Sequence, residues 1–456
     1  MPKRNLAWIL IVAAIALLMW QLPQMIAGRD SVMRAFGPLV DARAQIQRRY
    51  VEKVDDDRLV RDAVESAIRT MVQDLKDPYA LYLNQDEYRR FQNRTDGLYG
   101  GIGVEVWPTP DGLEVLSREP NSPAIRADIM PGDLITHIND LSVIGLPVVE
   151  IVNSMLNGPV DTSVKLIVVP RSNGAVAEPR EVVLYRTSIQ LDPVRGFARR
   201  PDGGWRFMLD PEHRIAYIRL VKFTSNVDER LDEAMNDLFA RNLRGLVLDL
   251  RENTGGLLES ARDVADRFLD HGQIVRTRGR KADGKQYFAS PEGTYPPFEL
   301  VVIVNGSTAS AAEIVAGALR DHQRAIVVGE RTYGKGSVQE VVPLASEHGA
   351  IKLTTAYYYL PNGECIHKTP AAANEGSWGV TPNVIVEFTP EQRQAWESAW
   401  REIDREVIPT DSDTAAGDPA SAPSEIVDEA SPPNEKTEQE LSPDVVRLLA
   451  DDMQLK

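Results

Sequence analysis

Ser310 stands where a predicted strand and turn give way to a helix that begins at Ala311. A serine at a helix start meets free backbone N–H groups and the positive end of the helix dipole. Those groups can stabilise an oxyanion that develops beside the serine. An isolated serine of this kind is more often a plain helix cap, so a second chemical group must decide between the two interpretations.

Lys335 is that second group, and it lies between two glycines in the segment "YGKGSVQ". A lysine acts as a general base only when its amine is neutral, which requires burial that lowers its pKa. Glycines on both sides permit a tight backbone path into a site, and Gln339 is placed to orient the amine. Taken alone, the segment also fits a surface lysine in a glycine turn.

A third feature is the segment "LVLDLRENTGGLL", in which a strand runs into a turn and then a helix. Gly255 and Gly256 can bring a backbone N–H close to a substrate carbonyl. An ordinary connection between a strand and a helix has the same appearance. Together with Ser310 and Lys335, the turn is interpreted as one half of an oxyanion hole.

Other chemistries fit the sequence less well. "GERTYGKGS" nearly matches a phosphate-binding loop, but Gly336 takes the Ser/Thr position and a strand follows where the motif needs a helix. Residues 100–106, "GGIGVEV", resemble a dinucleotide loop but also enter a strand. A Ser-His-Asp triad lacks its G-x-S-x-G turn, and no H-E-x-x-H or clustered His/Cys ligands occur. We therefore expect neither a metal nor a cofactor.

The elements around these residues alternate between strand and helix. "RIAYIRL", "GLVLDL", "LVVIVNG", "AIVVGE" and "IKLTTAYYYLP" read as strands, residues 228–242 and 257–270 as amphipathic helices, and residues 310–321 as a helix. Apolar runs of this kind predict a central sheet covered by helices. Residues 97–187 form a small β-rich domain with short helices near 122–127 and 148–156, and residues 31–93 read as helices throughout.

The two ends of the chain have compositions of their own. Lys3 and Arg4 precede an apolar run from Leu6 to Trp20, and no A-x-A cleavage site follows, so residues 1–29 are expected to be an uncleaved signal anchor. A helix is predicted at 391–408. Residues 409–440 carry nine acidic residues against one lysine and are expected to be a disordered linker, with a last helix at 441–456.

Composition limits the class of protein. The 456 residues are 43% hydrophobic and 26% charged, which excludes a polytopic membrane protein. The net charge of −16 argues against nucleic acid as a partner, because phosphate binding needs a basic surface. The lone Cys365 excludes an internal disulfide framework.

Several motifs agree in order and spacing with one family. "VNGSTASAAEIVAGALRD", "VVGERTYGKGSVQ", "LDLRENTGG" and "YGGIGVEV" with "IMPGDLITHIND" resemble the carboxy-terminal processing (tail-specific) serine proteases. The resemblance covers residues from about 36 to 390 of the sequence. Thr254, where a proline is usual, and Ala312, where a serine is frequent, are small departures.

The resemblance implies a fold and a catalytic set. The fold is α/β (α+β multidomain): a ClpP/crotonase-like serine protease core at 188–390, an inserted PDZ domain at 97–187 and a helical N-terminal region at 30–96. Ser310 is implied as nucleophile and Lys335 as general base oriented by Gln339, a serine–lysine variant of triad logic. The backbone N–H groups of Gly256 and Ala311 would form the oxyanion hole.

For the PDZ segment, the residues and the resemblance agree. Gly101, Ile102, Gly103 and Val104 would present backbone N–H groups to a peptide carboxylate, and the strand that follows would pair with the peptide. Protein substrates would then be bound by their C-terminal tails, with small apolar side chains preferred.

We therefore expect a serine endopeptidase on the extracytoplasmic (periplasmic) side, anchored to the inner membrane by its N-terminal helix. The helical N-terminal region is a candidate for homodimer formation, and an adaptor protein is a candidate partner. The alternative is a catalytically idle PDZ scaffold that captures tails without turnover. A further hypothesis is that the PDZ domain gates the active site when a tail binds.

Overall fold

The computed structural model describes residues 36–119, 121–146, 151–172, 175–200, 204–280, 284–345 and 348–404. They belong to two compact units, one with residues up to Asn84 and Val342–Lys352, the other with Gln85–Val341 and Leu353 onward. The predicted signal anchor at 1–29, acidic linker at 409–440 and last helix at 441–456 lie outside the described residues. Within the described ranges, no helix has the length and apolarity needed to cross a membrane.

The described residues of the first unit form helices and short strand segments. Residues 36–49 are helical, and α2 (Asp56–Gln73) begins at the N-cap Asp55, whose carboxylate accepts a hydrogen bond from the backbone N of Arg58 at 3.1 Å. β1 (Leu81–Leu83) pairs antiparallel with residues 350–352. The prediction of helices throughout 31–93 is therefore wrong at β1. A three-residue strand is too short to show a period, and its partner lies far along the chain.

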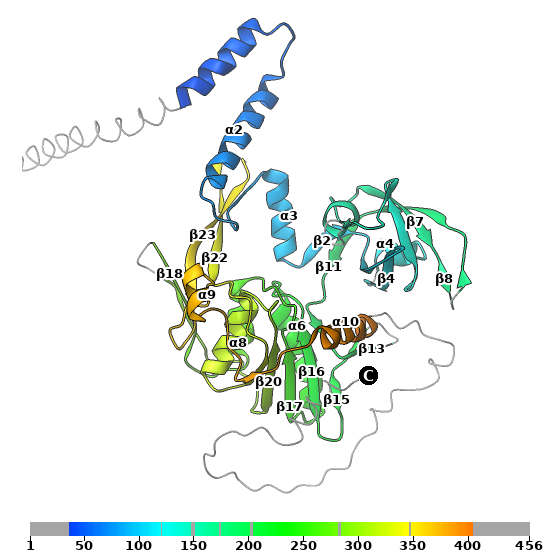
Figure 1. The fold of residues 1–456 in the computed structure, drawn as a ribbon, viewed down its shortest axis with the longest axis vertical. Helices are drawn as coiled ribbons and strands as arrows, with labels where there is room; N and C mark the ends of the chain where they lie inside the picture. The colour runs from blue at the N-terminus through cyan, green and yellow to red at the C-terminus, as the bar shows by residue number, and fades with distance from the viewer. Residues whose placement is uncertain are drawn as a thin grey trace, which may run out of the picture. The chain divides into compact units, whose positions relative to one another are not determined.

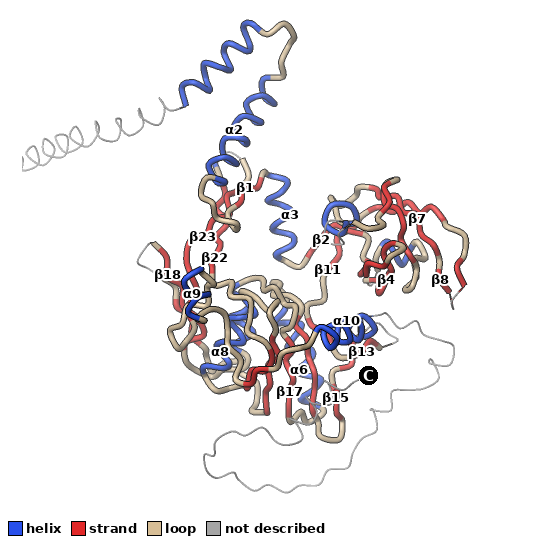
Figure 2. The backbone as a smooth tube through the Cα atoms, in the orientation of Figure 1, coloured by secondary structure: helices blue, strands red, loops and turns tan. Residues whose placement is uncertain are grey.

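The second unit begins with α3 (Gln85–Thr95) and a small β domain (Figure 2). The small β domain, residues 98–185, contains β2 (Leu98–Gly101), β3 (Val104–Thr109), β4 (Gly112–Arg118), α4 (Pro123–Arg126), β5 (Leu134–Ile138), β6 (Leu141–Ser142), η1 (Val152–Leu156), β7 (Ser163–Val169), β8 (Arg171–Ser172), β9 (Ala175–Val176) and β10 (Arg180–Tyr185). Its main sheet has the order β10-β7-β5-β4-β3, so β3 is an edge strand. Buried aliphatic side chains on the inner faces form its core.

A larger sheet forms the α/β core (Figure 1). Its order is β12-β16-β17-β20-β21-β24, and the pairs from β16 to β24 are parallel. β11 (Thr187–Gln190) pairs antiparallel with β2 and leads into this core. The elements that follow are β12 (Val194–Arg195), β13 (Ala198–Arg199) and β14 (Trp205–Arg206), which pair with each other, β15 (Met208–Asp210), β16 (Ile215–Leu220), α6 (Val227–Ala240), β17 (Gly245–Asp249), α7 (Leu258–Asp266), β20 (Glu299–Val304), α8 (Ala311–Asp321), β21 (Ile326–Gly329) and β24 (Val384–Ile385). The strands and helices predicted over this stretch are confirmed.

Alternation along the parallel strands separates two buried faces. Ile218, Leu248 and Val302 face the helices and join one apolar cluster with α6, α7 and α8. Tyr217 and Val247 point to the opposite face and join a second cluster. Because consecutive strands lie side by side in one direction, right-handed crossovers place all three helices on the same face. The opposite face of the sheet is not covered by α6, α7 or α8.

The remaining elements are β18 (Gln273–Gly279), β19 (Gln286–Phe288), β22 (Ser337–Pro343), β23 (Ala350–Tyr359), α9 (Pro370–Glu375) and α10 (Pro390–Asp404). β18 pairs antiparallel with β19 and with the end of β23, where Arg276 is opposite Tyr359. The helix predicted in 391–408 corresponds to α10.

A buried arginine closes the small β domain beside η1. Arg186 donates to the carbonyl oxygens of Met155 at 2.6 Å, Leu156 at 2.9 Å and Ser163 at 3.0 Å. Helix ends leave such carbonyls without partners inside the helix. The guanidinium therefore fixes η1 against β7.

We expect Arg186→Leu to destabilise this domain, because buried carbonyls lose charge-assisted hydrogen bonds worth about 1.5–3 kcal/mol each. Chemical denaturation of the full chain measures the change, with the exposed Arg206→Leu as the matched control. Equal unfolding midpoints for the two variants would show that Arg186 contributes nothing specific.

Candidate active site

Three turns meet at the carboxyl ends of parallel strands, where open α/β sheets place their ligands. Leu250–Gly256 follows β17, Asn305–Ser310 follows β20, and Glu330–Lys335 follows β21. The backbone N of Tyr333 donates to the carbonyl of Thr308 at 3.0 Å and joins the last two turns. The sequence motifs that carry the serine, the lysine and the paired glycines are thus brought to one edge of the sheet.

The turn after β17 is organised by Asn253, which is fully buried. Its side chain accepts a hydrogen bond from the N of Gly255 at 2.8 Å and donates to the carbonyl of Leu220 at 2.7 Å. Its own carbonyl accepts from the N of Ala309 at 2.9 Å. A Cβ placed on Gly255 would lie 2.7 Å from the Cβ of Ser310. The glycine turn therefore packs directly against the serine.

Ser310 occupies a backbone conformation that L-residues rarely adopt, with φ 60° and ψ −117°. Such strain persists only where surrounding contacts over-determine it, and it concentrates at functional sites. Here the hydrogen bond from Ala309 to Asn253 precedes the residue, and the backbone N of Ser310 donates to Glu313 Oε2 at 2.8 Å. Ser310 directly precedes α8, whose first residue is Ala311.

The backbone N–H groups of Gly256 and Ala311 have no hydrogen-bond acceptor in the part of the chain that the structure describes. Gly256 forms a parallel bridge with Phe223. The hydrogen bonds of this bridge run from Phe223 N to the carbonyl of Gly255 and from Leu257 N to the carbonyl of Phe223, so the N–H of Gly256 takes no part in them. Ala311 is at the helix start, where N–H groups lack partners within the helix. A Cβ on Gly255 would lie 2.8 Å from the N of Ala311, so the two donors are near neighbours. This arrangement suits an oxyanion.

Glu313 is the residue that the sequence analysis missed. Its side chain is fully buried, and one oxygen, Oε2, accepts from the backbone N of Ser310 at 2.8 Å and of Lys335 at 2.9 Å. The other oxygen accepts from the N of Gly334 at 2.7 Å and from the hydroxyl of Thr332. A single carboxylate thus holds the serine and lysine backbones together. The S-x-x-E spacing of a capping box was the signal that could have found it.

The four hydrogen bonds act against a cost of burial. Removal from water raises the pKa of Glu313, while the bonds from Thr332 and from the three backbone N–H groups act in the opposite direction. Because the folded-state pKa is raised, the buried charge costs stability at neutral pH, and the cost falls as pH drops through that pKa. Because the charged carboxylate of Glu313 costs stability at neutral pH, its role is better explained by the positioning of the serine and lysine backbones.

The glycines beside Lys335 are required by close approach. A Cβ on Gly334 would lie 2.7 Å from Trp378 Cδ1, and one on Gly336 would lie 2.4 Å from the N of His367. Gly334 also has a φ of 89°, which side-chain-bearing residues avoid. The backbone around the half-buried Lys335 is therefore clamped from both sides.

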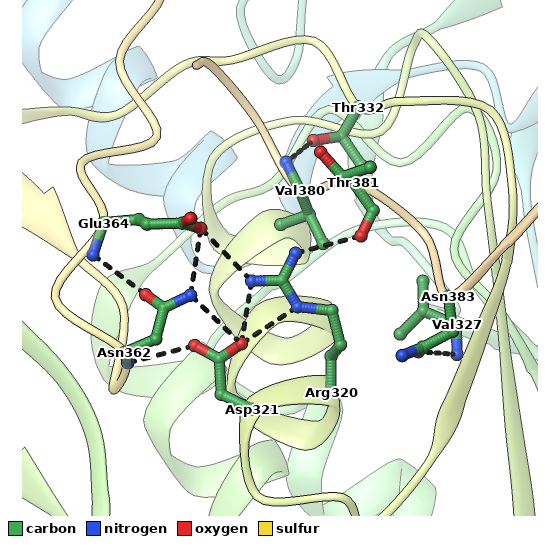
Figure 3. A network of polar contacts seen from close by, with 9 residues as sticks. All are labelled: Arg320, Asp321, Val327, Thr332, Asn362, Glu364, Val380, Thr381 and Asn383. Carbon is green, nitrogen blue, oxygen red and sulfur yellow. Dashed lines mark hydrogen bonds and ion pairs between the residues drawn. The ribbon is translucent and has the colours of Figure 1, made fainter. Parts of the chain in front are cut away.

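Further polar contacts connect α8 to residues that follow β23 (Figure 3). Thr332, which donates to Glu313, accepts from the N of Val380 at 2.6 Å. At the end of α8, Arg320 binds Asp321 and donates to the carbonyl of Thr381 at 2.9 Å. Residues after β23 are in this way tied to both ends of α8.

Gln339 lies on β22, and its amide donates to the Ser337 hydroxyl at 2.9 Å and to the Thr354 hydroxyl at 3.4 Å. These contacts fix its side chain next to the segment that follows Lys335. An orienting contact from Gln339 to the lysine amine stays a prediction.

The predicted carboxylate-binding residues, Gly101 to Val104, connect β2 to the edge strand β3. The carbonyl of Ile102 accepts from Ala124 N at 3.0 Å, and that of Gly103 accepts from Glu119 N at 2.9 Å. Because a trans peptide directs its N–H opposite to its C=O, the N–H groups of Gly103 and Val104 point away from these partners. Binding of a peptide carboxylate by this loop, with pairing of the peptide along β3, stays a prediction.

Comparison with known proteins identifies the family of this chain. Residues 214–386 match the family described as peptidase family S41, and residues 22–87 match the N-terminal domain of the activating protease CtpB. The carboxy-terminal-processing protease of Bartonella bacilliformis is 34% identical over 352 residues, which are 76% of this chain and 74% of that protein. The chain belongs to the carboxy-terminal processing protease family. It is a serine-type peptidase with an α/β multidomain fold.

Other members of the family match over similar lengths. CtpA of Bacillus subtilis is 31% identical over 395 residues, covering 85% of this chain and 78% of CtpA. The chloroplastic carboxyl-terminal-processing peptidase 2 of Arabidopsis thaliana is 35% identical over 337 residues, covering 71% of this chain and 60% of that protein. The solved photosystem II D1 C-terminal processing protease is 27% identical with a TM-score of 0.45, covering 81% and 97% of the two chains.

Gly255→Ala should lower kcat by at least ~100-fold, because the new methyl group displaces the serine turn by contact with Ser310 and Ala311. Gly293→Ala is the matched control: its φ of 83° imposes the same backbone strain, yet the nearest atom to a Cβ is 3.5 Å away. Steady-state cleavage of a protein substrate measures both variants. Equal losses would mean that strain, and not the contact with Ser310, is responsible.

Glu313→Gln replaces one acceptor oxygen with an N–H donor, so either the backbone N–H of Gly334 or those of Ser310 and Lys335 lose their acceptor, at about 1–3 kcal/mol each. We expect a lower melting temperature and a lower kcat. The exposed Glu259→Gln in the first turn of α7 is the control. Wild-type kcat in Glu313→Gln would contradict a positioning role.

Proposed function

We propose that the chain is an endopeptidase with a Ser310–Lys335 dyad that cleaves proteins selected by their C-terminal tails. The observation that carries the dyad is the shared carboxylate of Glu313. Because Ser310 N and Lys335 N bind the same Oε2 atom, the two backbones lie within the sum of the two hydrogen-bond lengths. The side chains of Ser310 and Lys335 therefore start close to each other, near the first turn of α8.

In the proposed reaction, the neutral amine of Lys335 accepts the hydroxyl proton as Ser310 Oγ attacks the scissile carbonyl carbon. The resulting ammonium gives its proton to the leaving amine as the peptide C–N bond breaks, and an ester to Ser310 remains. Lys335 then accepts a proton from water, which attacks the ester and releases the carboxylate product. Serine regains its proton, so acid and base are restored.

The negative charge on the tetrahedral oxygen is proposed to lie between the N–H groups of Gly256 and Ala311. Both donors are unpaired among the described residues and border the serine turn. The start of α8 adds the positive end of its dipole at the same point. Removal of one such donor typically costs about 10²–10³ in kcat.

We propose that the small β domain is a PDZ domain that binds the tail of the substrate. The tail carboxylate would meet the loop from Gly101 to Val104, and the tail backbone would extend the sheet along β3. β3 ends the sheet order among the described strands, so its outer edge has no strand partner there. Apolar tail side chains would then set affinity.

We also propose an extracytoplasmic location, with the N-terminal apolar segment as a membrane anchor. The support is the basic start followed by the apolar run from Leu6 to Trp20. Homodimer formation through the N-terminal helices is proposed because Phe36, Leu39 and Val40 are exposed apolar residues. An adaptor that delivers substrates remains part of the proposal.

Ser310→Ala and Lys335→Ala should each abolish cleavage of a protein that ends in an apolar tail, while both variants still bind the tail. Ser307→Ala is the matched control, because this half-buried serine lies on the same loop and its described hydrogen bond comes from its backbone N–H. Product formation is followed by mass spectrometry. Continued cleavage by either dyad variant would refute the dyad.

A tail that ends in aspartate in place of an apolar residue should raise KM with little change in kcat. Tail selection contributes to binding and not to the chemical step, so the split between the two constants is diagnostic. Equal KM values for both tails would refute recognition by the small β domain.

A further inference from the structure

Helix α10 lies on the face of the large sheet that α6, α7 and α8 leave open. It contacts β13 and β4 (orange in Figure 1, beside β13). On that face, alternation places Tyr217 and Arg219 of β16 beside Asp249 of β17. All three are buried, and two of them carry charge. A helix that covers this surface must therefore offer polar or aromatic groups.

Two tryptophans of α10 meet the arginines of this surface. Trp396 and Trp400 pack against each other with ring centroids 4.4 Å apart and ring planes tilted by 50°. The guanidinium of Arg219 lies 4.1 Å from the Trp400 ring, and that of Arg251 lies 4.9 Å from Trp396 and 5.5 Å from Trp400. A guanidinium close to an aromatic ring is attracted to it electrostatically, and more strongly where water is excluded.

The last residue of α10, Asp404, completes the charge balance. Its carboxylate pairs with Arg219 and lies 3.3 Å from Arg195. Arg195 also pairs at 3.1 Å with Glu105, which stands on the edge strand β3 of the small β domain. Both guanidiniums are more than nine-tenths buried. Without Asp404 a buried positive charge would be left uncompensated, which is strongly destabilising.

Arg251 connects this cluster to the active site. Its Nε lies 3.0 Å from both carboxylate oxygens of Asp249, and its backbone N donates to the same group at 2.9 Å. Tyr217 donates to Asp249 at 2.7 Å. Arg251 stands two residues before Asn253, whose side chain and carbonyl fix Gly255 and Ala309. Trp396 and Trp400 thus contact Arg251, near the start of the turn Leu250–Gly256.

We infer that α10 is a positioning element of the active site, in which Trp400 and Asp404 hold Arg219 and Arg251 and so fix the turn that ends at Gly256. The inference rests on the proposed function for its readout. Through Arg195 and Glu105, the same helix joins the strand proposed to receive the tail to the turn proposed to bind the oxyanion. Disturbing α10 therefore changes the chemical step while the tail-binding loop itself stays intact.

The experiment uses the full chain with Trp400→Leu, Trp400→Phe and Asp404→Asn, and with the exposed Glu397→Gln of the same helix as control. kcat and KM are measured on a protein with an apolar tail, and tail affinity is measured with a fluorescent C-terminal peptide. We expect kcat to fall ~10- to 100-fold in Trp400→Leu and Asp404→Asn. KM and peptide affinity should stay within about twofold, and Trp400→Phe should recover most of kcat because its ring keeps the cation–π contact.

Wild-type kcat in folded Trp400→Leu and Asp404→Asn would overturn the inference, as would a loss confined to KM or to the melting temperature. If Trp400→Leu does not fold, Asp404→Asn and Trp400→Phe decide, because each keeps the volume or the ring of the native side chain. Failure of the proposed dyad is seen separately, as cleavage that persists in Ser310→Ala.

Discussion

The site depends on one interaction: a buried carboxylate shared by the backbones of two catalytic candidates. Glu313 is placed by α8, accepts from Ser310 N and Lys335 N through the same oxygen, and binds Gly334 N through the other. If the serine turn or the lysine turn moved away, its backbone N–H groups would lose their hydrogen bonds to Glu313 in a dry interior, where unpaired donors are costly. The strain at Ser310 is sustained by these contacts.

The parallel sheet explains why the parts meet. Strands β17, β20 and β21 end at one edge of the sheet, and each is followed by a turn that carries one part of the site. α8 leaves that edge from Ser310, so its free N–H groups and its dipole point at the space beside the serine. Asn253 then locks the glycine turn against the serine turn. Side chains contribute by fixing backbone, and backbone contributes the donors.

The sequence predicted much of this because several signals agreed. Long apolar strands and amphipathic helices specified the α/β core, and glycine pairs marked the turns that close approach requires. Ser310 and Lys335 were predicted from residue type and context, and the structure brings their backbones together. Glu313 was missed because a buried acid in a helix looks like an ordinary capping residue until its distant partners are known. β1 was missed because its pairing residues lie in another part of the chain, and the contacts of Arg251 with α10 arise from tertiary packing alone.

In the proposed reaction, Ser310 becomes acylated with the help of Lys335. Its most direct measurement is mass spectrometry of the full chain quenched with acid during turnover, followed by peptide mapping. We expect an acyl adduct on the peptide that contains Ser310, and no adduct in Lys335→Ala. An adduct on Ser307 or Ser337, or undiminished acylation in Lys335→Ala, would contradict it.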